Sequence, residues 1–390
     1  MAKRKIVKIH NKSDKPDNIV SKEYEIDRKS KSIEETLPTF LGGFFQYLRG
    51  NVLPMTRLAY LHDISFFCEY IIENTGLSSA KKNRDISLEE FNNIKAIDVN
   101  IFLDYARQYE KETSKAVYIY ENSNKTLARK KSSISVMFKH LYRDELIDKN
   151  ITDGFDPIRV PKAHEREIKA LQDDEVMIML DAVTTGVGLT DKEKQYWKKT
   201  KKRDKAILIV FLTYGLRLSE LQQLNISSFN FNRGEFTIYR KRGKESTMPL
   251  NDSVTAVLTD YIENERAGND ESDVDNKSDD DALFLSLQGR RLTDRQIRQL
   301  VKKYTSIGMK TSRNSGYSPH KLRATTATSL ISRGNSIFDV QALLDHEQVT
   351  TTQLYAAHKM NVKRDLIRDM EWEKERLEGR EDTDISQDKN

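Results

Sequence analysis

Cysteine and long apolar runs are both nearly missing from this chain of 390 residues. The single cysteine, Cys68, excludes an intrachain disulfide and a zinc site made of several cysteines. The longest apolar run, AILIVFL, is far shorter than the roughly 20 residues of a membrane-spanning helix. The first residues, MAKRKIVKIH, lack the apolar stretch of a secretory signal. We therefore expect a cytoplasmic protein with no membrane partner.

The charge is unevenly spread, and two segments are strongly acidic. Residues 263–281 hold nine acids and two bases, and residues 365–390 hold ten acids and five bases. The net charge of the whole chain is +5, so the remaining residues carry +17. A basic body of this size favours a polyanionic partner, most often nucleic acid. Charge that serves solubility alone would give the same composition and stays an alternative.

The length predicts two domains, because a single hydrophobic core rarely grows to 390 residues. Residues 1–31 are rich in bases and poor in large apolar side chains, which predicts a flexible basic arm. The stretch SIEE at 32–35 has the pattern of a capping box and predicts a helix start. From there to about Tyr142 the patterning is helical, and Cys68 falls on an apolar stripe, which predicts core packing. We expect a helical domain over 32–162.

One helix of this domain combines an apolar side with a basic end. The spacing over 126–142 predicts that one side carries Leu127, Ile134, Met137, Phe138 and Leu141. Four cations gather at the N-terminal end, namely Lys125, Arg129, Lys130 and Lys131. Such a helix is suited to lie against DNA phosphates, and a solvated basic face is an equally good interpretation.

The segment GFDPIRVPKAHEREIKALQDDEV predicts a linker over 163–172 and a new helix near Asp173, which opens a second domain over 173–362. AILIVFLTYGLRLSELQQL predicts a buried helix, a break at Gly215 and a second helix. NRGEFTIYRKRGKESTMPLN alternates apolar and polar residues around Arg-Gly turns, which predicts a small antiparallel sheet. The acidic stretch 263–281 predicts a disordered loop. The expected fold class is mainly α with a small antiparallel β-sheet in the second domain.

The second domain also holds residues that suit phosphate chemistry. SPHKLRATTAT predicts a helix that begins at Ser318, with His320 and Arg323 one turn apart at an anion-attracting helix N-terminus. The other candidates are Arg217, Glu220, Lys241, His346 and Tyr355. Two arginines can bind the non-bridging oxygens of a phosphate, a tyrosine can attack it, and a lysine can protonate the leaving alkoxide. With 16 tyrosines in the chain, this pattern alone does not single out one nucleophile.

Three motifs resemble the signatures of the tyrosine recombinase, or phage integrase, family. TYGLRLSELQQL resembles T-G-L-R-x-S-E-L, and SPHKLRATTAT resembles H-x-L-R-H-x-x-A-T. LLDHEQVTTTQLYAAH resembles L-L-G-H-x-x-x-x-T-x-x-x-Y. The intervals also agree with the family, with 23 residues from Arg323 to His346 and nine more to Tyr355. The resemblance covers about 33–362.

A fourth stretch, RKRGKESTMPL, is similar to G-K-G-x-K-x-R-x-V-P-L. Counting back from Pro249 selects Lys241 as the family's lysine, with Lys244 in the place of the second lysine. Two departures stand out, since Asp345 replaces a glycine and Ala324 replaces a histidine. Neither departure removes a catalytic group.

The resemblance implies a role for each candidate. Tyr355 is the nucleophile that forms a 3′-phosphotyrosyl link and frees a 5′-hydroxyl. The other implied roles are phosphate binding by Arg217, Arg323 and His346, general acid catalysis by Lys241, assistance to proton transfer by His320, and positioning of cations by Glu220. The resemblance implies neither a metal nor another cofactor.

The resemblance further implies a site-specific recombinase of double-stranded DNA, acting on the bacterial nucleoid in integration and excision of a mobile element or in replicon resolution. A helical core-DNA-binding domain and a mixed α/β catalytic domain would form a clamp, and a homotetramer would act on two DNA sites. A C-terminal helix and acidic tail over 363–390 are expected to dock on a neighbouring protomer or on their own domain. Accessory directionality or host factors stay open. The alternatives are a type IB topoisomerase and a non-catalytic DNA-binding regulator.

Overall fold

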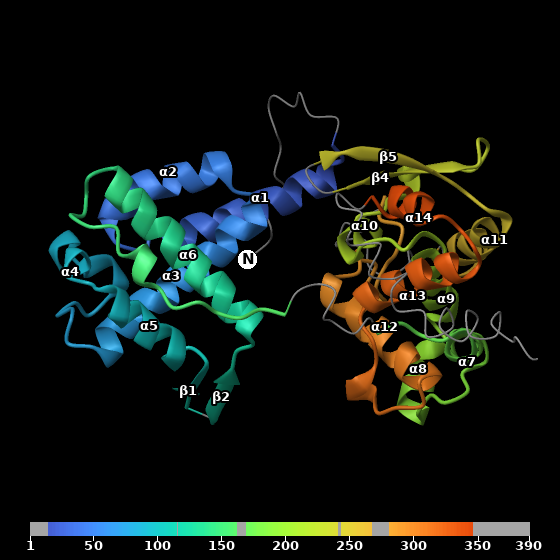
Figure 1. Ribbon diagram of the computed structural model, residues 1–390. Coiled ribbons are helices and arrows are strands. Elements are labelled where there is room, and N and C mark those ends of the chain that lie inside the picture. The colour runs from blue at the N-terminus through green and yellow to red at the C-terminus, as the bar shows by residue number, and fades with distance from the viewer. Residues whose placement is uncertain (1–14, 115, 162–168, 241–242, 267–280, 346–390) are drawn as a thin grey trace, which may run out of the picture. The chain divides into compact units, whose positions relative to one another are not determined.

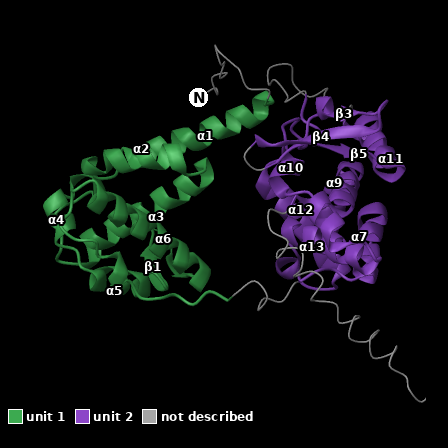
Figure 2. Cartoon of the chain, turned by 45° about the horizontal axis from the view of Figure 1, so that its top comes forward, with its two compact units in different colours: residues 1–161 green, residues 162–390 purple. Residues whose placement is uncertain are grey.

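The computed structural model describes residues 15–114, 116–161, 169–240, 243–266 and 281–345. The chain divides into two compact units, Met1–Pro161 and Lys162–Asn390, which Figure 2 shows in separate colours. Both are mainly helical, and small antiparallel sheets accompany the helices (Figure 1). The expected fold class is thus confirmed. No helix in the described ranges is long and apolar enough to cross a membrane.

The first unit packs its helices around one apolar core. Its elements are α1 (Asp17–Glu34), α2 (Gly42–Asn51), α3 (Pro54–Asn74), α4 (Leu88–Asn92), α5 (Ala96–Tyr105), β1 (Gln108–Glu112), β2 (Val117–Glu121) and α6 (Asn124–Arg143). The core gathers apolar side chains from α2, α3, α5 and α6, and Cys68 is fully buried in it. The apolar side predicted for 126–142 is buried too, so both packing predictions are confirmed.

The N-terminal part of this unit differs from the prediction. Helix α1 occupies a segment where a flexible arm was expected, and Ser32 and Glu35 lie at its end instead of at a helix start. Apolar side chains near the beginning of α1 are buried, α1 packs along α3, and Arg57 of α3 donates to Asp27 of α1. Packing against α3 and a bond from a buried arginine therefore order a segment whose composition is that of an arm. Residues 1–14 lie outside the described residues.

The hairpin of β1 and β2 is a second departure, since the whole stretch to Tyr142 was expected to be helical. The sequence of β2, VYIYE, is rich in β-branched and aromatic residues, which favour an extended backbone. Tyr109 lies directly opposite Tyr120, and their rings stack with centroids 5.1 Å apart. Cross-strand pairing of aromatic side chains thus outweighs the helical periodicity of the flanking segments.

The second unit surrounds the buried helix α9 with other helices and a three-stranded sheet. Its helices are α7 (Asp173–Thr185), α8 (Asp191–Trp197), α9 (Lys201–Tyr214), α10 (Leu218–Gln222), α11 (Asp252–Tyr261), α12 (Asp294–Gly308), α13 (Pro319–Ser332) and α14 (Ile337–Leu344). The strands β3 (Phe229–Asn230), β4 (Glu235–Tyr239) and β5 (Glu245–Pro249) pair antiparallel in that order. Helix α9 packs against α7, α11 and α13. The helix start near Asp173 and the small sheet are as predicted.

The predicted break at Gly215 is present and lets two helix ends approach each other. Gly215 follows α9 with φ +57°, a conformation that L side chains rarely adopt. A Cβ atom at this position would lie 2.6 Å from a methyl carbon of Leu344, at the end of α14. The glycine therefore allows the carboxyl ends of α9 and α14 to meet.

Ordered packing reaches into both predicted loops. Leu171, inside the predicted linker 163–172, is buried in the core of the second unit. The π-helical turn Ile262–Arg266 continues α11, so ordered structure extends past residue 263, the predicted start of the acidic loop. In both places a buried side chain, Leu171 or Arg266, fixes part of a segment whose composition is mostly polar. The remaining loop residues 162–168 and 267–280 lie outside the described residues.

Candidate active site

Three arginines from different parts of the second unit meet at the carboxyl end of α14. Their Nη2 atoms donate to three consecutive backbone carbonyls, Arg240 to Leu343 at 2.9 Å, Arg323 to Leu344, and Arg217 to Asp345 at 3.1 Å. A helix C-terminus leaves carbonyls without intrahelical partners and carries partial negative charge, so it attracts cations. These carbonyls therefore gather the arginine cluster, defined here as Arg217, Arg240 and Arg323.

Arg217 is fixed by a buried carboxylate just after the break at Gly215. Its backbone amide donates to Glu220 Oε2 at 2.8 Å, and its Nη1 donates to Glu220 Oε1 at 2.7 Å. The side chain of Glu220 is 2% exposed, whereas that of Arg217 is 33% exposed. The carboxylate thus holds a guanidinium that an anion from solvent can still reach.

Arg323 lies deeper and links α13 to the ends of α9 and α14. The residue is 3% exposed, and its Nη1 donates to the carbonyl of Gly215 at 2.7 Å. Thr326, one turn further on, donates to the carbonyl of Leu212 at 3.0 Å, which fastens α13 to α9. Since the carbonyl of Gly215 holds Arg323 and the chain reaches Arg217 two residues later, one glycine break positions both arginines.

His320 lies at the predicted start of α13, one turn before Arg323. Pro319 is the first residue of the helix, as expected, although Ser318 makes no capping hydrogen bond with its side chain. His320 is exposed, in contrast to Arg323. The start of α13 therefore presents an imidazole to solvent next to a buried guanidinium.

The tip of the β4–β5 hairpin also reaches the arginine cluster. The amide of Arg240 donates to the carbonyl of Lys244 at 2.7 Å, and the amide of Gly243 donates to the carbonyl of Arg240 at 3.1 Å. The ammonium of Lys244 pairs with Asp345 Oδ1 at 3.0 Å. Two contacts, one from Arg240 and one from Lys244, therefore connect this tip to the end of α14. Lys241, which follows Arg240, lies outside the described residues.

Asp345 occupies a position where the family pattern has glycine, and it adopts the left-handed conformation with φ +49°. Asp and Asn adopt this conformation more readily than most other residues. Burial acts to raise the pKa of Asp345, but the hydrogen bond from Lys244 and the charges of Arg240, Lys244 and Arg217 outweigh it and lower that pKa. The substitution thus keeps the backbone turn and adds a carboxylate that faces three cations.

The structure brings together Arg217, Glu220 and Arg323, with His320 at the start of the same helix as Arg323. His346 and Tyr355 lie outside the described residues. Sequence reasoning missed Arg240. A signal was available, because Arg240 stands directly before Lys241, where the quoted family pattern has glycine.

The basic end of α6 differs from the prediction of a phosphate-binding patch. Lys130 is 8% exposed, and its ammonium lies 3.2 Å from Oδ1 of the buried Asp63. Arg129 donates to the same carboxylate, and Lys131 donates to two backbone carbonyls that follow α6. Lys130 therefore uses its charge inside the core, which argues against the predicted phosphate contact of this residue. Of the four predicted cations, Lys125 is the exposed one outside these contacts.

Replacing Asp63 by alanine is expected to destabilise the first unit by about 3 kcal/mol, because it leaves Lys130 buried without its partner. Burial raises the pKa of Asp63 even though Lys130 and Arg129 act to lower it. Desolvation of the carboxylate therefore opposes the ion pair, and the close contact with Lys130 offsets that cost. Hydrogen exchange of α3 and α6 peptides in the full chain measures the change. The double variant Asp63→Leu with Lys130→Met should recover most of the lost protection. Unchanged exchange in Asp63→Ala would mean that the pair contributes nothing.

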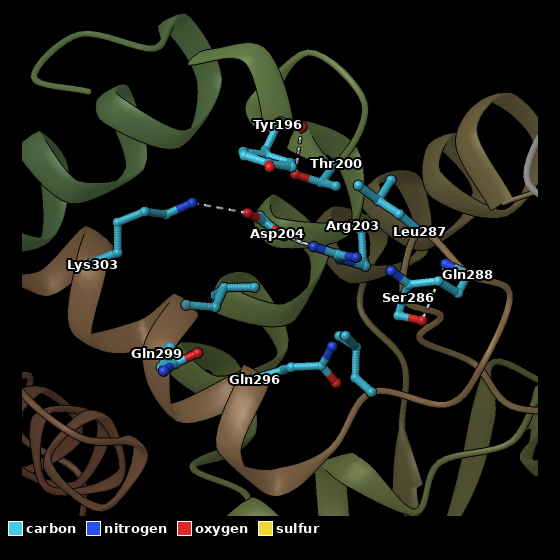
Figure 3. A pocket seen from close by; sticks show the side chains of 12 residues that line it. Tyr196, Thr200, Arg203, Asp204, Ser286, Leu287, Gln288, Gln296, Gln299 and Lys303 are labelled. Atoms are coloured by element: carbon cyan, nitrogen blue, oxygen red, sulfur yellow. Dashed lines mark hydrogen bonds and ion pairs between the residues drawn. The ribbon is translucent and has the colours of Figure 1, made fainter. Parts of the chain in front are cut away.

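A cavity of about 300 Å³ lies among α8, α9, α12 and residues 286–288 (Figure 3). There, Asp204 Oδ1 accepts a hydrogen bond from Arg203 at 2.8 Å, and its Oδ2 accepts one from the buried Tyr304 at 3.0 Å and lies 3.4 Å from Lys303 Nζ. These charges satisfy one another, and none of the predicted site residues lines the cavity. Burial, together with the charge of Asp204, raises the pKa of Tyr304, which makes this hydroxyl a poor nucleophile.

Comparison of the sequence with known families gives one match over the second unit. The profile of the phage integrase family matches residues 169–361. A protein named tyrosine recombinase XerC from Natranaerobius thermophilus is 36% identical over 239 residues, which are 60% of this chain and 72% of that protein.

Comparison with solved structures gives matches over most of the chain. The XerH site-specific recombinase bound to palindromic difH substrate, a post-cleavage complex, has a TM-score of 0.57 and 18% identity, and the match covers 93% of this chain and 91% of that chain. A lambda integrase tetramer bound to a Holliday junction has a TM-score of 0.53 and 13% identity, with 81% and 76% covered. At these identities the likeness concerns the fold.

Proposed function

The chain belongs to the phage integrase family of tyrosine recombinases, and from that premise we propose that it is a site-specific recombinase that cleaves and rejoins double-stranded DNA through a covalent tyrosine ester. The observation that carries this proposal is the arginine cluster. Arg217 and Arg323 both fall in family motifs, and they donate to consecutive backbone carbonyls at the carboxyl end of α14. The side chain of Arg217 is also partly exposed to solvent. Two fixed guanidinium groups suit a phosphodiester, because each can bind a non-bridging oxygen with paired N–H groups.

In the cleavage step, the hydroxyl oxygen of Tyr355 attacks the phosphorus, and a new Tyr–O–P bond forms while the bond to the 5′ oxygen breaks. Arg217 and Arg323 stabilise the charge that develops on the non-bridging oxygens. Lys241 donates a proton to the departing 5′ oxygen. The tyrosine ester retains the energy of the phosphodiester bond, so attack by a 5′-hydroxyl of another strand rejoins DNA without ATP.

Two histidines complete the proposed site. His320, exposed one turn before Arg323, accepts the proton that leaves the tyrosine hydroxyl. His346, which follows Asp345 in the sequence, donates a hydrogen bond to the phosphate. Glu220 does not touch the phosphate in this account and serves to hold Arg217. Positively charged side chains of the protein thus stabilise the negative charge that develops on the phosphate.

We place four copies of the chain on two DNA sites during recombination. The fold shared with a recombinase crystallised as a tetramer on a Holliday junction supports this arrangement. In the first unit, Lys125 stays the candidate phosphate contact at the start of α6, because Lys130 is buried. We also propose that the acidic segment 363–390 docks on a neighbouring copy.

The general acid can be identified with a modified substrate. Lys241→Ala should slow cleavage of normal DNA and be rescued by DNA with a 5′-thiolate leaving group, because a thiolate departs without a proton. The comparison is the ratio of single-turnover cleavage rates on the two substrates. Lys244→Ala is the matched control, since Lys244 is mostly exposed and pairs with Asp345, and it should show a mild defect without selective rescue. The reverse pattern would move the acid to Lys244.

A two-site plasmid tests the proposed function. Supercoiled DNA would carry two copies of a site that the protein selects from the DNA flanking its gene. The expected products are recombinant circles whose junctions lie within the sites. Relaxed topoisomers without recombinants would indicate a type IB topoisomerase, and binding without either product would indicate a regulator.

A further inference from the structure

Arg240 is buried but poorly paired. The residue is 6% exposed, Nη2 donates to the carbonyl of Leu343 at 2.9 Å, and the same nitrogen lies 3.5 Å from Met248 Sδ. Among the residues that the structure describes, the buried Nε group has no hydrogen-bond partner. Burial lowers the pKa of this guanidinium, although the charges of Glu220 and Asp345 oppose that effect. A buried charge with an unpaired donor costs free energy, and an apolar side chain of similar size would often be tolerated as well or better.

The position of Arg240 explains why a costly side chain is useful there. It follows the last residue of β4 and stands directly before Lys241, and its partner Leu343 lies near the end of α14, three residues before His346. It is also the member of the arginine cluster that the proposed mechanism does not use as a phosphate ligand. Arg240 therefore connects the hairpin with the lysine to the helix end that holds the two phosphate-binding arginines.

We propose that Arg240 is a positioning residue that fixes the carboxyl end of α14 against Arg217 and Arg323. Its bond to the carbonyl of Leu343 keeps the next two carbonyls aligned with the Nη2 atoms of those arginines. Loss of the bond lets the helix end shift and misplaces the phosphate clamp together with the chain that leads to the nucleophile. This inference rests on the recombinase function proposed above.

The test compares Arg240→Met with the wild-type full-length chain. Cleavage of a nicked DNA duplex should slow by roughly 10²-fold, because a displacement of about 1 Å at a reacting centre has an effect of that size. Normal and 5′-thiolate DNA should be affected equally, since the lysine is not the group that is misplaced. Affinity for the DNA and the melting temperature should be unchanged or higher. Hydrogen exchange at the end of α14 should be faster than in the wild type.

Arg240→Lys is the matched variant, because an ammonium can donate to the carbonyl of Leu343, and it should recover part of the rate. Wild-type cleavage in Arg240→Met, with or without a loss of stability, would overturn this inference alone. Selective rescue by the thiolate would also overturn it, because the residue would then serve Lys241 and not α14. Should Arg240→Met fail to fold, slower cleavage of both substrates by Arg240→Lys together with faster exchange at the end of α14 would support the inference, and wild-type cleavage with faster exchange at α14, or thiolate rescue of the lysine variant, would overturn it. Absence of cleavage by the wild-type chain would overturn the recombinase function itself.

Discussion

Tyr355→Phe is expected to abolish the covalent protein–DNA adduct while DNA binding stays unchanged. The substitution removes only the attacking oxygen, and no other group in the proposed site can form the ester. The expected loss is at least about 10⁴-fold in cleavage rate, as for other enzymes that lose a nucleophile. Adducts on nicked DNA are measured in denaturing gels, and binding is measured by gel shift under the same conditions.

Tyr317→Phe provides a matched control, because Tyr317 lies three residues before His320 and is partly buried in the same unit. It should form adducts at nearly the wild-type rate. Trapping of Tyr355→Phe would show that another tyrosine attacks, and Tyr317 would then be the first to examine. Tyr304 is a weaker alternative, because it is fully buried and donates its hydroxyl to Asp204.

Arg323→Lys is expected to reduce the cleavage rate by roughly 10²–10³-fold, the effect of losing one preorganised donor in a transition state. The guanidinium donates to the carbonyls of Gly215 and Leu344 through different nitrogens, and it is proposed to bind the phosphate as well. An ammonium on a flexible chain cannot reproduce this planar arrangement. Arg217→Lys should act similarly, because Glu220 holds the fork of Arg217 through Nη1.

Single-turnover cleavage by both variants measures these losses. Arg313→Lys is the control, since Arg313 pairs with Glu193 at 3.0 Å and with the carbonyl of Gly188 at 2.7 Å, away from the α14 carbonyls. It should cleave DNA at a nearly normal rate. Near-normal rates for both Arg217→Lys and Arg323→Lys would remove these residues from the phosphate clamp.

The sequence predicted those parts of the fold whose pattern is local. The break at Gly215, the start of α13 and the β4–β5 hairpin follow from glycine, proline and alternating residues, and each is present. Helix α1 was missed because it packs against α3, a partner that composition does not reveal. The β1–β2 hairpin was missed because its apolar and aromatic residues were counted as part of a helical pattern.

Long-range polar contacts were the hardest to predict. Lys130 falls between Leu127 and Ile134 on the apolar side of α6, so its spacing already indicated burial. Its partner Asp63 lies 67 residues earlier, and no local pattern identifies it. Arg240 is the same case, because the carbonyl of Leu343 is 103 residues away in the sequence. Motifs therefore predicted Arg217 and Arg323 as site candidates, and the structure was needed to see which contacts hold them.

Mapping the DNA adduct to one peptide tests the central claim most directly. The wild-type chain is incubated in EDTA with nicked DNA that carries its selected site, the complex is digested, and the peptide that retains a nucleotide is identified by mass spectrometry. The account predicts one modified peptide with the 3′-phosphate attached to Tyr355, formed at the same rate with and without EDTA. Attachment at another residue, or cleavage that leaves no nucleotide on the protein, would contradict it.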